Sequence, residues 1–164
     1  MRARHPQHLH DFDYLGPNRY SLTFCTDKRL KIFTVAPVVE LVNAQFLRAC
    51  TEQYFAIVAY CFMPDHVHLL AEGTREDSDL KRFQAVAKQY SGFYYKQQYG
   101  HRLWQRYGYE CVLRSQDQTL DVVRYILANP IRTGLAKSVN EYPFSGSSVF
   151  SLEELMEGLQ VESG

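Results

Sequence analysis

Two histidines separated by a single residue, His66 and His68, are the part of this sequence best suited to chemistry. They follow a Met-Pro-Asp turn at residues 63–65 and open an apolar run, residues 66–71, that is typical of a β-strand. Successive side chains of a strand point to opposite faces, so we expect both imidazoles on one face of a sheet. Such a pair can bind one metal ion. The alternative is a pair of ordinary sheet histidines held by hydrogen bonds.

A tyrosine and an asparagine, Tyr125 and Asn129, lie four residues apart within a helical pattern. Residues at this spacing share a face of a helix, so a phenol and a carboxamide would point the same way. Ordinary roles compete with a functional one. An asparagine before a proline, here Pro130, is a common helix stop, and a lone tyrosine often belongs to the core with its hydroxyl hydrogen-bonded. The spacing alone leaves both interpretations open.

The pattern of apolar residues predicts the elements that must carry these side chains. Strands and helices follow in the order β-α-β-β-α-β, and one more helix comes after them. The expected bounds are residues 19–26, 38–53, 54–62, 66–71, 78 or 79 to 99, 103–113 and 120–128. This order is typical of an α+β fold of the ferredoxin-like (split βαβ) kind, with an antiparallel sheet and an additional C-terminal helix.

Caps and breakers set the expected ends of the last two helices. Ser78 or Asp79 caps the first of them, whereas Asp117 or Thr119 caps the second, which Pro130 ends or kinks. The first helix is expected to place its apolar side chains along one side: Leu80, Phe83, Val86 or Ala87, Tyr90 and Tyr94.

Composition narrows the class of protein. The chain has 164 residues, 46% hydrophobic and 22% charged, which is typical of one globular domain and excludes a disordered chain. The longest apolar run, residues 54–63, is about half as long as the ~20 residues that a membrane-spanning helix needs. No apolar stretch follows the basic N-terminus, so we expect no secretory signal, a cytoplasmic protein and no membrane partner. The four cysteines form no Cys-x-x-Cys pair and are expected to be reduced, buried and apolar in behaviour.

Charge is distributed unevenly although the formal net charge is zero. Residues 138–164 hold five glutamates and no basic residue, which leaves 18 basic against 13 acidic residues, or +5, in residues 1–137. Residues 81–109 contain nine aromatic residues and no acidic one. This composition suits single-stranded or hairpin DNA, because cations pair with phosphates and rings stack on bases, although scattered cations are often only a solvated surface. The candidate DNA-binding residues are Lys81, Arg82, Lys88, Lys96, Arg102 and Arg106.

Four strings occur in order along the chain: YSLTFCTDKRLKIF at 20–33, FMPDHVHLL at 62–70, RYILANPIRTGL at 124–135 and EYPFSGSS at 141–148. Together they resemble the REP-associated tyrosine transposases, which belong to the HUH single-tyrosine transposase class. The resemblance covers about residues 18–150, and it implies a fold of the HUH-endonuclease type.

The resemblance also implies residue roles. His66 and His68 are the HUH metal ligands, Asn129 completes the metal site and Tyr125 is the nucleophile. The implied activity is that of a transposase: a metal-dependent, site-specific single-stranded DNA endonuclease and strand transferase, acting on hairpin-forming repeats through a covalent phosphotyrosine. Mg²⁺ or Mn²⁺ suits a phosphate-binding site of this kind. Asp65 lies at a turn, where a carboxylate usually caps its own backbone.

Three other interpretations compete with this one. Tyr94 and Tyr95 could form a nucleophile pair, but adjacent residues of a helix point in different directions. A ferredoxin-like module could bind single-stranded DNA or RNA without cutting it. A zinc hydrolase could use His66 and His68, but no third ligand follows at a zinc spacing. Monomer and homodimer are both compatible with the sequence.

The chain is expected to divide into an N-terminal extension (1–17), a catalytic domain (18–150) and an acidic tail (151–164). The tail has the apolar spacing of a short amphipathic helix. Its glutamates are expected to be drawn to the basic surface and to compete there with DNA, and the alternative is a solvated, frayed end.

Overall fold

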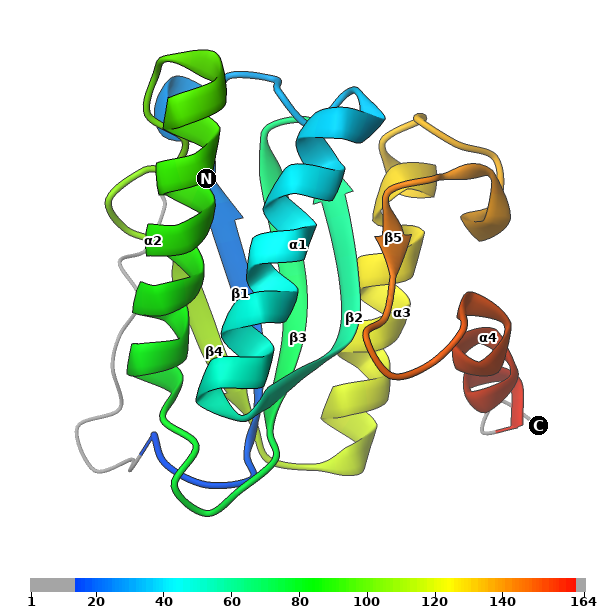
Figure 1. The fold of residues 1–164 in the computed structure, drawn as a ribbon. Coiled ribbons are helices and arrows are strands. Elements are labelled where there is room, and N and C mark those ends of the chain that lie inside the picture. Colours follow the sequence, from blue (N-terminus) through cyan, green and yellow to red (C-terminus); the bar gives the residue numbers. More distant parts are fainter. Residues whose placement is uncertain (1–13, 162–164) are drawn as a thin grey trace.

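A five-stranded antiparallel sheet forms the centre of the protein, whose computed structural model describes residues 14–161 (Figure 1). The strands lie side by side in the order β4-β1-β3-β2-β5. Their bounds are β1 Arg19–Cys25, β2 Phe55–Met63, β3 His66–Gly73, β4 Tyr109–Leu113 and β5 Ser145–Gly146. Four helices accompany them: α1 Ala36–Gln53, α2 Leu80–Tyr99, α3 Gln116–Arg132 and α4 Leu152–Val161.

The order of elements confirms the predicted fold class. The first six elements follow as β1-α1-β2-β3-α2-β4, and β1 and β3 are the inner strands between β4 and β2. This is the split βαβ arrangement, to which α3 is added as the predicted extra helix. The short β5, which was not predicted, pairs with the outer edge of β2.

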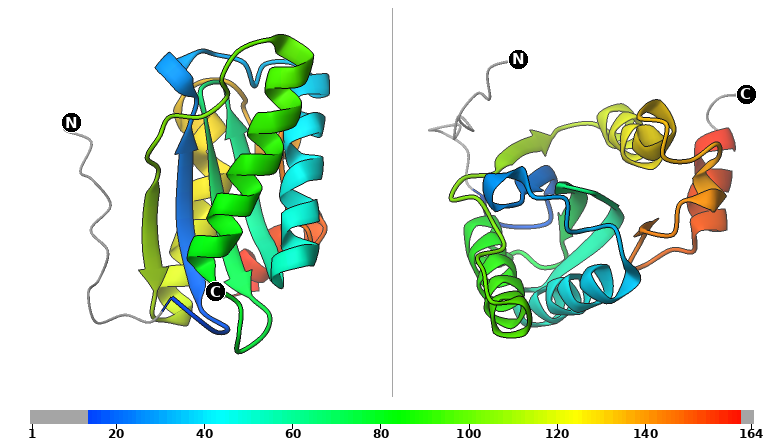
Figure 2. Two further views of the ribbon diagram at one scale, coloured as in Figure 1. Left: turned by 60° about the vertical axis from the view of Figure 1, so that its left-hand side comes forward. Right: turned by 90° about the horizontal axis from the view of Figure 1, so that it is seen from above.

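The helices cover the two faces of the sheet unequally. α1 and α2 lie side by side on one face, whereas α3 and α4 lie on the other side (Figures 1 and 2). The larger core fills the space beneath α1 and α2. Alternate residues of β1, namely Tyr20, Leu22 and Phe24, are buried there, and the rings of Phe46 and Trp104 stack with centroids 6.0 Å apart. Side-chain alternation therefore directs the remaining residues of β1 toward the face of α3.

A second, smaller core holds α3 against the sheet. Val123, Ile126 and Leu127 of α3 are buried with residues of β2 and β3, among them Cys61 and Leu70. These α3 positions recur at three to four residues, which is the spacing of one helix face. The same packing fixes α3 over the sheet face that carries His66 and His68.

α3 differs from its prediction at both ends. Ser115, rather than Asp117 or Thr119, is the N-cap, and its side chain accepts a hydrogen bond from the backbone N–H of Gln118. Pro130 lies inside the helix and does not end it. Because a proline so close to the C-terminus removes only one backbone hydrogen bond, the last turn stays closed, with the N–H of Thr133 donating to the carbonyl of residue 129 at 3.2 Å.

β4 is shorter than predicted. Only residues 109–113 of the expected 103–113 form a strand. Trp104 makes an isolated bridge to Thr26, and the backbone at Gly108 then approaches β1 so closely that a Cβ there would lie 2.7 Å from the carbonyl oxygen of Thr23. Residues 103–108 therefore follow β1, but their pairing with it is irregular and becomes a continuous ladder only from residue 109.

α2 has the predicted bounds, with Asp79 as N-cap and Gly100 in the left-handed conformation after its end. The prediction of its buried side was wrong in the second half of the helix, where Ser91 and Tyr95 are buried in place of Tyr90 and Tyr94. The observed stripe advances by four residues from Ala87 to Ser91 and again to Tyr95, so the predicted Tyr90 and Tyr94 each lie one residue too early.

The four cysteines are free thiols, as expected. The expectation that all are buried was wrong, because only Cys50 and Cys61 are buried and Cys111 is exposed on β4. β4 is an edge strand whose α3-side face is not fully covered, so its alternate residues reach solvent. Within residues 14–161, no helix has the length and apolar character that crossing a membrane needs.

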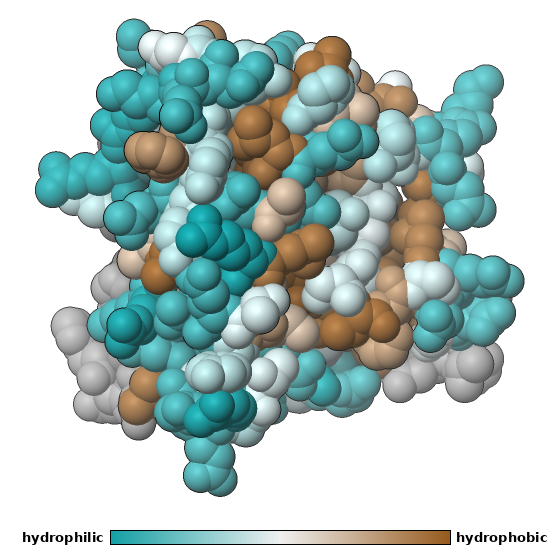
Figure 3. All heavy atoms as spheres, in the orientation of Figure 1, coloured by the Kyte–Doolittle hydropathy of each residue, from teal (hydrophilic) through white to brown (hydrophobic). Residues whose placement is uncertain are grey.

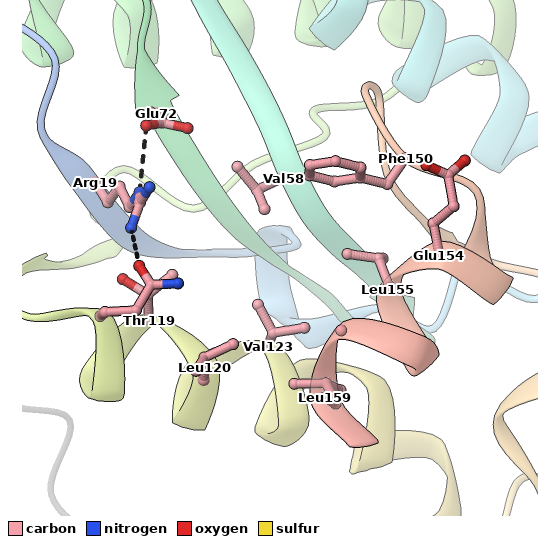
Figure 4. A pocket seen from close by; sticks show the side chains of 12 residues that line it. Arg19, Val58, Glu72, Thr119, Leu120, Val123, Phe150, Glu154, Leu155 and Leu159 are labelled. Atoms are coloured by element: carbon pink, nitrogen blue, oxygen red, sulfur yellow. Dashed lines mark hydrogen bonds and ion pairs between the residues drawn. The ribbon is translucent and has the colours of Figure 1, made fainter. Parts of the chain in front are cut away.

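The predicted tail helix exists as α4, but its position contradicts the expected attraction to the basic surface. Leu155 is buried in the smaller core beside α3, on the opposite side of the molecule from α2. A cavity of about 280 Å³ separates α4 from α3 and the sheet (Figure 4). Apolar packing therefore decides where the helix lies, rather than its carboxylates. Residues 1–13 of the predicted N-terminal extension and 162–164 of the tail lie outside the described residues.

Candidate active site

His66 and His68 lie side by side on the α3 face of β3. Their ring centroids are 4.7 Å apart and the rings are nearly perpendicular, at 83°. In the register of the sheet, His66 is paired with Cys25 of β1 and His68 with Thr23. Both histidines are half-buried, with the side chain of His66 at 18% exposure. The alternation predicted from the sequence thus places two imidazoles together at an accessible position.

Each imidazole is oriented by a hydrogen bond at Nδ1. The Nδ1 of His68 lies 2.9 Å from the hydroxyl oxygen of Thr23, and the Nδ1 of His66 lies 2.7 Å from Oδ1 of Asp65. A carboxylate only accepts, so the Nδ1–H of His66 donates to Asp65. With Nδ1 engaged in this way, Nε2 is the nitrogen that each ring can offer to a ligand, which is the usual arrangement of metal-binding histidines.

The electrostatics of His68 favour its neutral form. Burial, followed by the charges of His66, Arg132 and Arg29, lowers the pKa of His68 from 6.5 to about 4. The imidazole is therefore uncharged at neutral pH, and its free nitrogen keeps the lone pair that a cation needs.

The sequence suggested that Asp65 caps its own turn, but its carboxylate instead binds two other side chains. Its second oxygen forms an ion pair with Nη2 of Arg29 at 3.0 Å while the first holds His66. Burial raises the pKa of Asp65, but the hydrogen bond from His66 and the charge of Arg29 outweigh burial and lower it overall. Asp65 is thus a charged bridge between Arg29 and His66. Sequence reasoning missed both Arg29 and Thr23, because only strand pairing brings them to the histidines.

Tyr125 of α3 lies against His68. The two ring centroids are 5.7 Å apart, with the edge of one ring directed at the other at 80°. Tyr125 is 53% exposed, so a substrate can reach it. The guanidinium carbon of Arg132 also lies over this ring, 4.0 Å from its centroid. Arg132 was not predicted, although its spacing of seven residues puts it on the same helix face as Tyr125.

Asn129 lies one turn beyond Tyr125 on α3 and is 6% exposed. Arg19, at the start of β1, donates to Gln116, at the start of α3, and is paired with Glu72 near the end of β3. The start of α3 therefore lies near the end of β3. Because α3 runs opposite to β3, its later turns approach the end of β3 that carries His66. Within the described residues, the carboxamide of Asn129 makes no hydrogen bond. It is therefore an uncommitted polar group on the turn that follows Tyr125.

The donor set is compatible with a divalent metal ion. Two oriented imidazoles and an uncommitted carboxamide supply nitrogen and oxygen ligands and leave other coordination positions for phosphate oxygens. A cluster of three or more His, Cys, Asp or Glu side chains able to hold a metal is not found among residues 14–161. A metal here would thus need the amide oxygen of Asn129, or substrate and water, in addition to the two histidines.

Four of the six candidate DNA-binding cations line one cavity. Lys88, Lys96, Arg102 and Arg106 line this cavity of about 440 Å³ between α2 and the segment that precedes β4, together with Phe93. We call this the basic groove. Lys81 and Arg82 lie at the start of α2 and do not line it, and the Lys81 ammonium instead lies 5.4 Å from the ring centre of Tyr14.

The side of the molecule formed by α2 is predominantly hydrophilic (Figure 3). Lys88 is partly buried, and this burial lowers the pKa of its ammonium group. The groove also lies near the histidines. The N–H of Gln105 donates to the carbonyl of Cys25 at 2.9 Å, and Cys25 is paired on its other side with His66. At about 5 Å between neighbouring strands, the groove segment and His66 are roughly 10 Å apart.

Comparison with known proteins gives concordant similarities. Residues 17–129 match the family model described as Transposase IS200 like. A Haemophilus influenzae protein assigned to the REP-associated tyrosine transposases is 26% identical over 144 residues, covering 81% of each chain. The REP-associated tyrosine transposase of Escherichia coli is 24% identical over 107 residues, or 65% of this chain and 62% of that protein. The solved structure of a REP-associated tyrosine transposase bound to a REP hairpin superposes with a TM-score of 0.71 at 20% identity, covering 85% and 82% of the two chains.

Proposed function

Because the chain belongs to the IS200-like family of DNA transposases, we propose that it cuts and rejoins single-stranded DNA with Tyr125 as nucleophile and a divalent metal ion at His66, His68 and Asn129. Residues 18–150 form the catalytic domain in this proposal. One observation carries it: the exposed ring of Tyr125 lies 5.7 Å from the ring of His68, on the sheet face that both histidines share.

The reaction exchanges one phosphoester for another. The phenol oxygen of Tyr125 attacks the phosphorus, an O–P bond forms, and the bond from phosphorus to a sugar oxygen breaks. The phenol proton is lost to solvent as the departing oxygen takes one up, which leaves a phosphotyrosine and a free hydroxyl on the other strand end. Since the phosphoester is conserved, the reverse attack by a hydroxyl can rejoin the strand with no nucleotide cofactor.

The protein's own groups prepare this step in two ways. Asp65 and Thr23 fix the imidazole planes of His66 and His68 through Nδ1. α3 holds Tyr125 over the same face, so that nucleophile and ligands share one rigid frame. A bound Mg²⁺ or Mn²⁺ would neutralise negative charge on the phosphate. Asn129 supports this assignment because its carboxamide has no other partner within the described residues.

Hairpin DNA is the proposed substrate. The structurally similar REP-associated transposase was solved with a REP hairpin, and the basic groove of this chain supplies four cations beside α2, one strand pairing away from the strand that carries the histidines. Two exposed aromatic residues follow the groove segment along the chain, Tyr107 at 58% and Tyr109 at 48% exposure, and Tyr109 is paired with Thr23 of β1. Cations that follow the backbone and rings that stack on unpaired bases are the usual means of holding a single strand.

The test is covalent capture. Hairpin DNA with a labelled single-stranded flank is incubated with the protein and Mn²⁺, and a denaturing gel separates free DNA from protein-bound DNA. We expect an adduct that disappears in Y125F and persists in Y94F, a matched control on α2, while hairpin affinity is unchanged in both. Binding without any adduct would instead favour a non-catalytic DNA-binding module. An adduct in Y125F would show that another residue is the nucleophile.

A further inference from the structure

We propose that Arg132 is a positioning residue that holds the phenol of Tyr125 in line for attack. The inference rests on the proposed function, because it assigns a role beside the proposed nucleophile. Arg132 contacts Tyr125 twice. Its guanidinium carbon lies 4.0 Å from the ring centroid, and its Nη2 donates to the backbone carbonyl of Tyr125 at 2.8 Å.

Tyr125 needs such a contact because little else restrains it. The side chain is 53% exposed, and its hydroxyl makes no hydrogen bond within the described residues. An exposed aromatic side chain can change its χ1 rotamer, and each rotamer sends the hydroxyl in a different direction. Two side chains contact the ring: His68, at 5.7 Å between centroids, and Arg132, whose guanidinium carbon lies over the ring. Without Arg132 only one of these two contacts remains.

The geometry gives Arg132 more than the common role of a cation at a helix end. A basic residue in the last turn usually reaches the final carbonyls. Arg132 instead reaches back seven residues, and a single guanidinium holds both the backbone and the ring of Tyr125. Because one planar group makes both contacts, the ring orientation is coupled to the helix backbone. Lysine cannot replace it fully, since an ammonium is a point charge that neither stacks nor makes both contacts at once.

Arg132 also lies near the proposed metal ligands. His68 and the guanidinium both contact the ring of Tyr125, so the positive charge of Arg132 lies close to that imidazole. This charge therefore opposes a cation at the histidines. Loss of Arg132 should leave metal affinity equal or higher, whereas the loss of a metal ligand should lower it. This difference separates a residue that positions the nucleophile from one that supports the metal.

The experiment compares R132A and R132K with R124A. Arg124 is a matched control, since it is a half-exposed arginine of the same helix whose guanidinium pairs with Asp121. Single-turnover adduct formation on hairpin DNA is followed with Mn²⁺. We expect kcat to fall roughly 10- to 100-fold in R132A with KM nearly unchanged, since a misplaced nucleophile loses rate rather than binding. R132K should fall between R132A and the native protein, R124A should match the native protein, and millimolar guanidinium should partly restore R132A.

Two further measurements do not depend on activity. In protein labelled with 3-fluorotyrosine, the ¹⁹F resonance assigned to Tyr125 by its absence in Y125F should shift in R132A and stay unchanged in R124A. Mn²⁺ affinity should be equal or tighter in R132A. A native adduct rate or an unmoved resonance in R132A would overturn the proposal. So would a loss confined to KM, which would make Arg132 a DNA-binding cation. Persistent adduct in Y125F would instead refute the proposed nucleophile.

Discussion

Acid should destabilise this protein through His68, and the size of the effect follows from its surroundings. The pKa of His68 is 6.5 in an open chain and about 4 in the fold, because burial and nearby cations oppose its charge. Below pH 6.5 the imidazole of His68 is protonated in the unfolded chain, whereas in the folded protein it stays neutral until about pH 4. The stability contributed by neutral His68 is therefore complete above pH 6.5 and is lost as the pH falls toward 4.

The loss in the free energy of unfolding is about 3 kcal/mol at its limit, at 1.36 kcal/mol per pKa unit. Between pH 7 and pH 5 it is about 2 kcal/mol. The perturbation is H68Q, which stays neutral at every pH. Urea unfolding with EDTA present gives the free energy of unfolding of both proteins at pH 7 and pH 5. The native protein should lose about 2 kcal/mol more than H68Q over this interval, because carboxylate contributions common to both cancel.

Equal losses in the two proteins would refute this reasoning, since the folded imidazole would then titrate as in an open chain. An NMR titration of the His68 ring gives an independent check. Its resonances should stay unshifted down to pH 5 and move only near pH 4. An ordinary titration midpoint near 6.5 would show that the ring is hydrated despite its burial.

Three other predictions follow from the site, the groove and the tail. D65N removes the charged acceptor of the adjacent imidazole and should weaken Mn²⁺ binding about 10- to 100-fold by calorimetry, with unchanged circular dichroism; unchanged affinity would deny Asp65 its orienting role. The double variant K96Q/R102Q should make the slope of log affinity for single-stranded DNA against log salt shallower by about 1.4, at ~0.7 per contact, whereas K81Q should not alter it. L155A should lower the free energy of unfolding by about 2–4 kcal/mol and leave DNA affinity unchanged, since α4 packs in the smaller core; tighter DNA binding at low salt would restore the idea of a competing tail.

The sequence predicted those features whose cause is local. Alternation along a strand is sufficient to put His66 and His68 on one face, and helical spacing is sufficient to align Tyr125 with Asn129. The order of elements also determined the fold class, because the split βαβ arrangement has few other ways to bury its apolar faces.

The sequence could not predict the groups that orient these side chains. Thr23 reaches His68 across a strand pairing between residues 45 positions apart, and nothing in either segment specifies that register. Arg132 lies beyond Pro130, which ordinarily marks a helix end, so its contact with Tyr125 depends on the helix continuing. The basic segment was likewise divided by tertiary packing, which keeps Lys81 away from the groove.

The close approach at Gly108 limits how the proposed DNA-binding edge could be redesigned. Its backbone lies against the carbonyl of Thr23, and the hydroxyl of the same threonine holds His68. An engineer could exchange the charge and aromatic character of Arg106 or Tyr109 to alter which DNA is bound. A single methyl group at position 108 would instead push against the strand that orients the imidazole. Side-chain substitutions could thus alter the proposed DNA specificity without disturbing the proposed catalytic site. At residue 108, however, any added side chain would affect both.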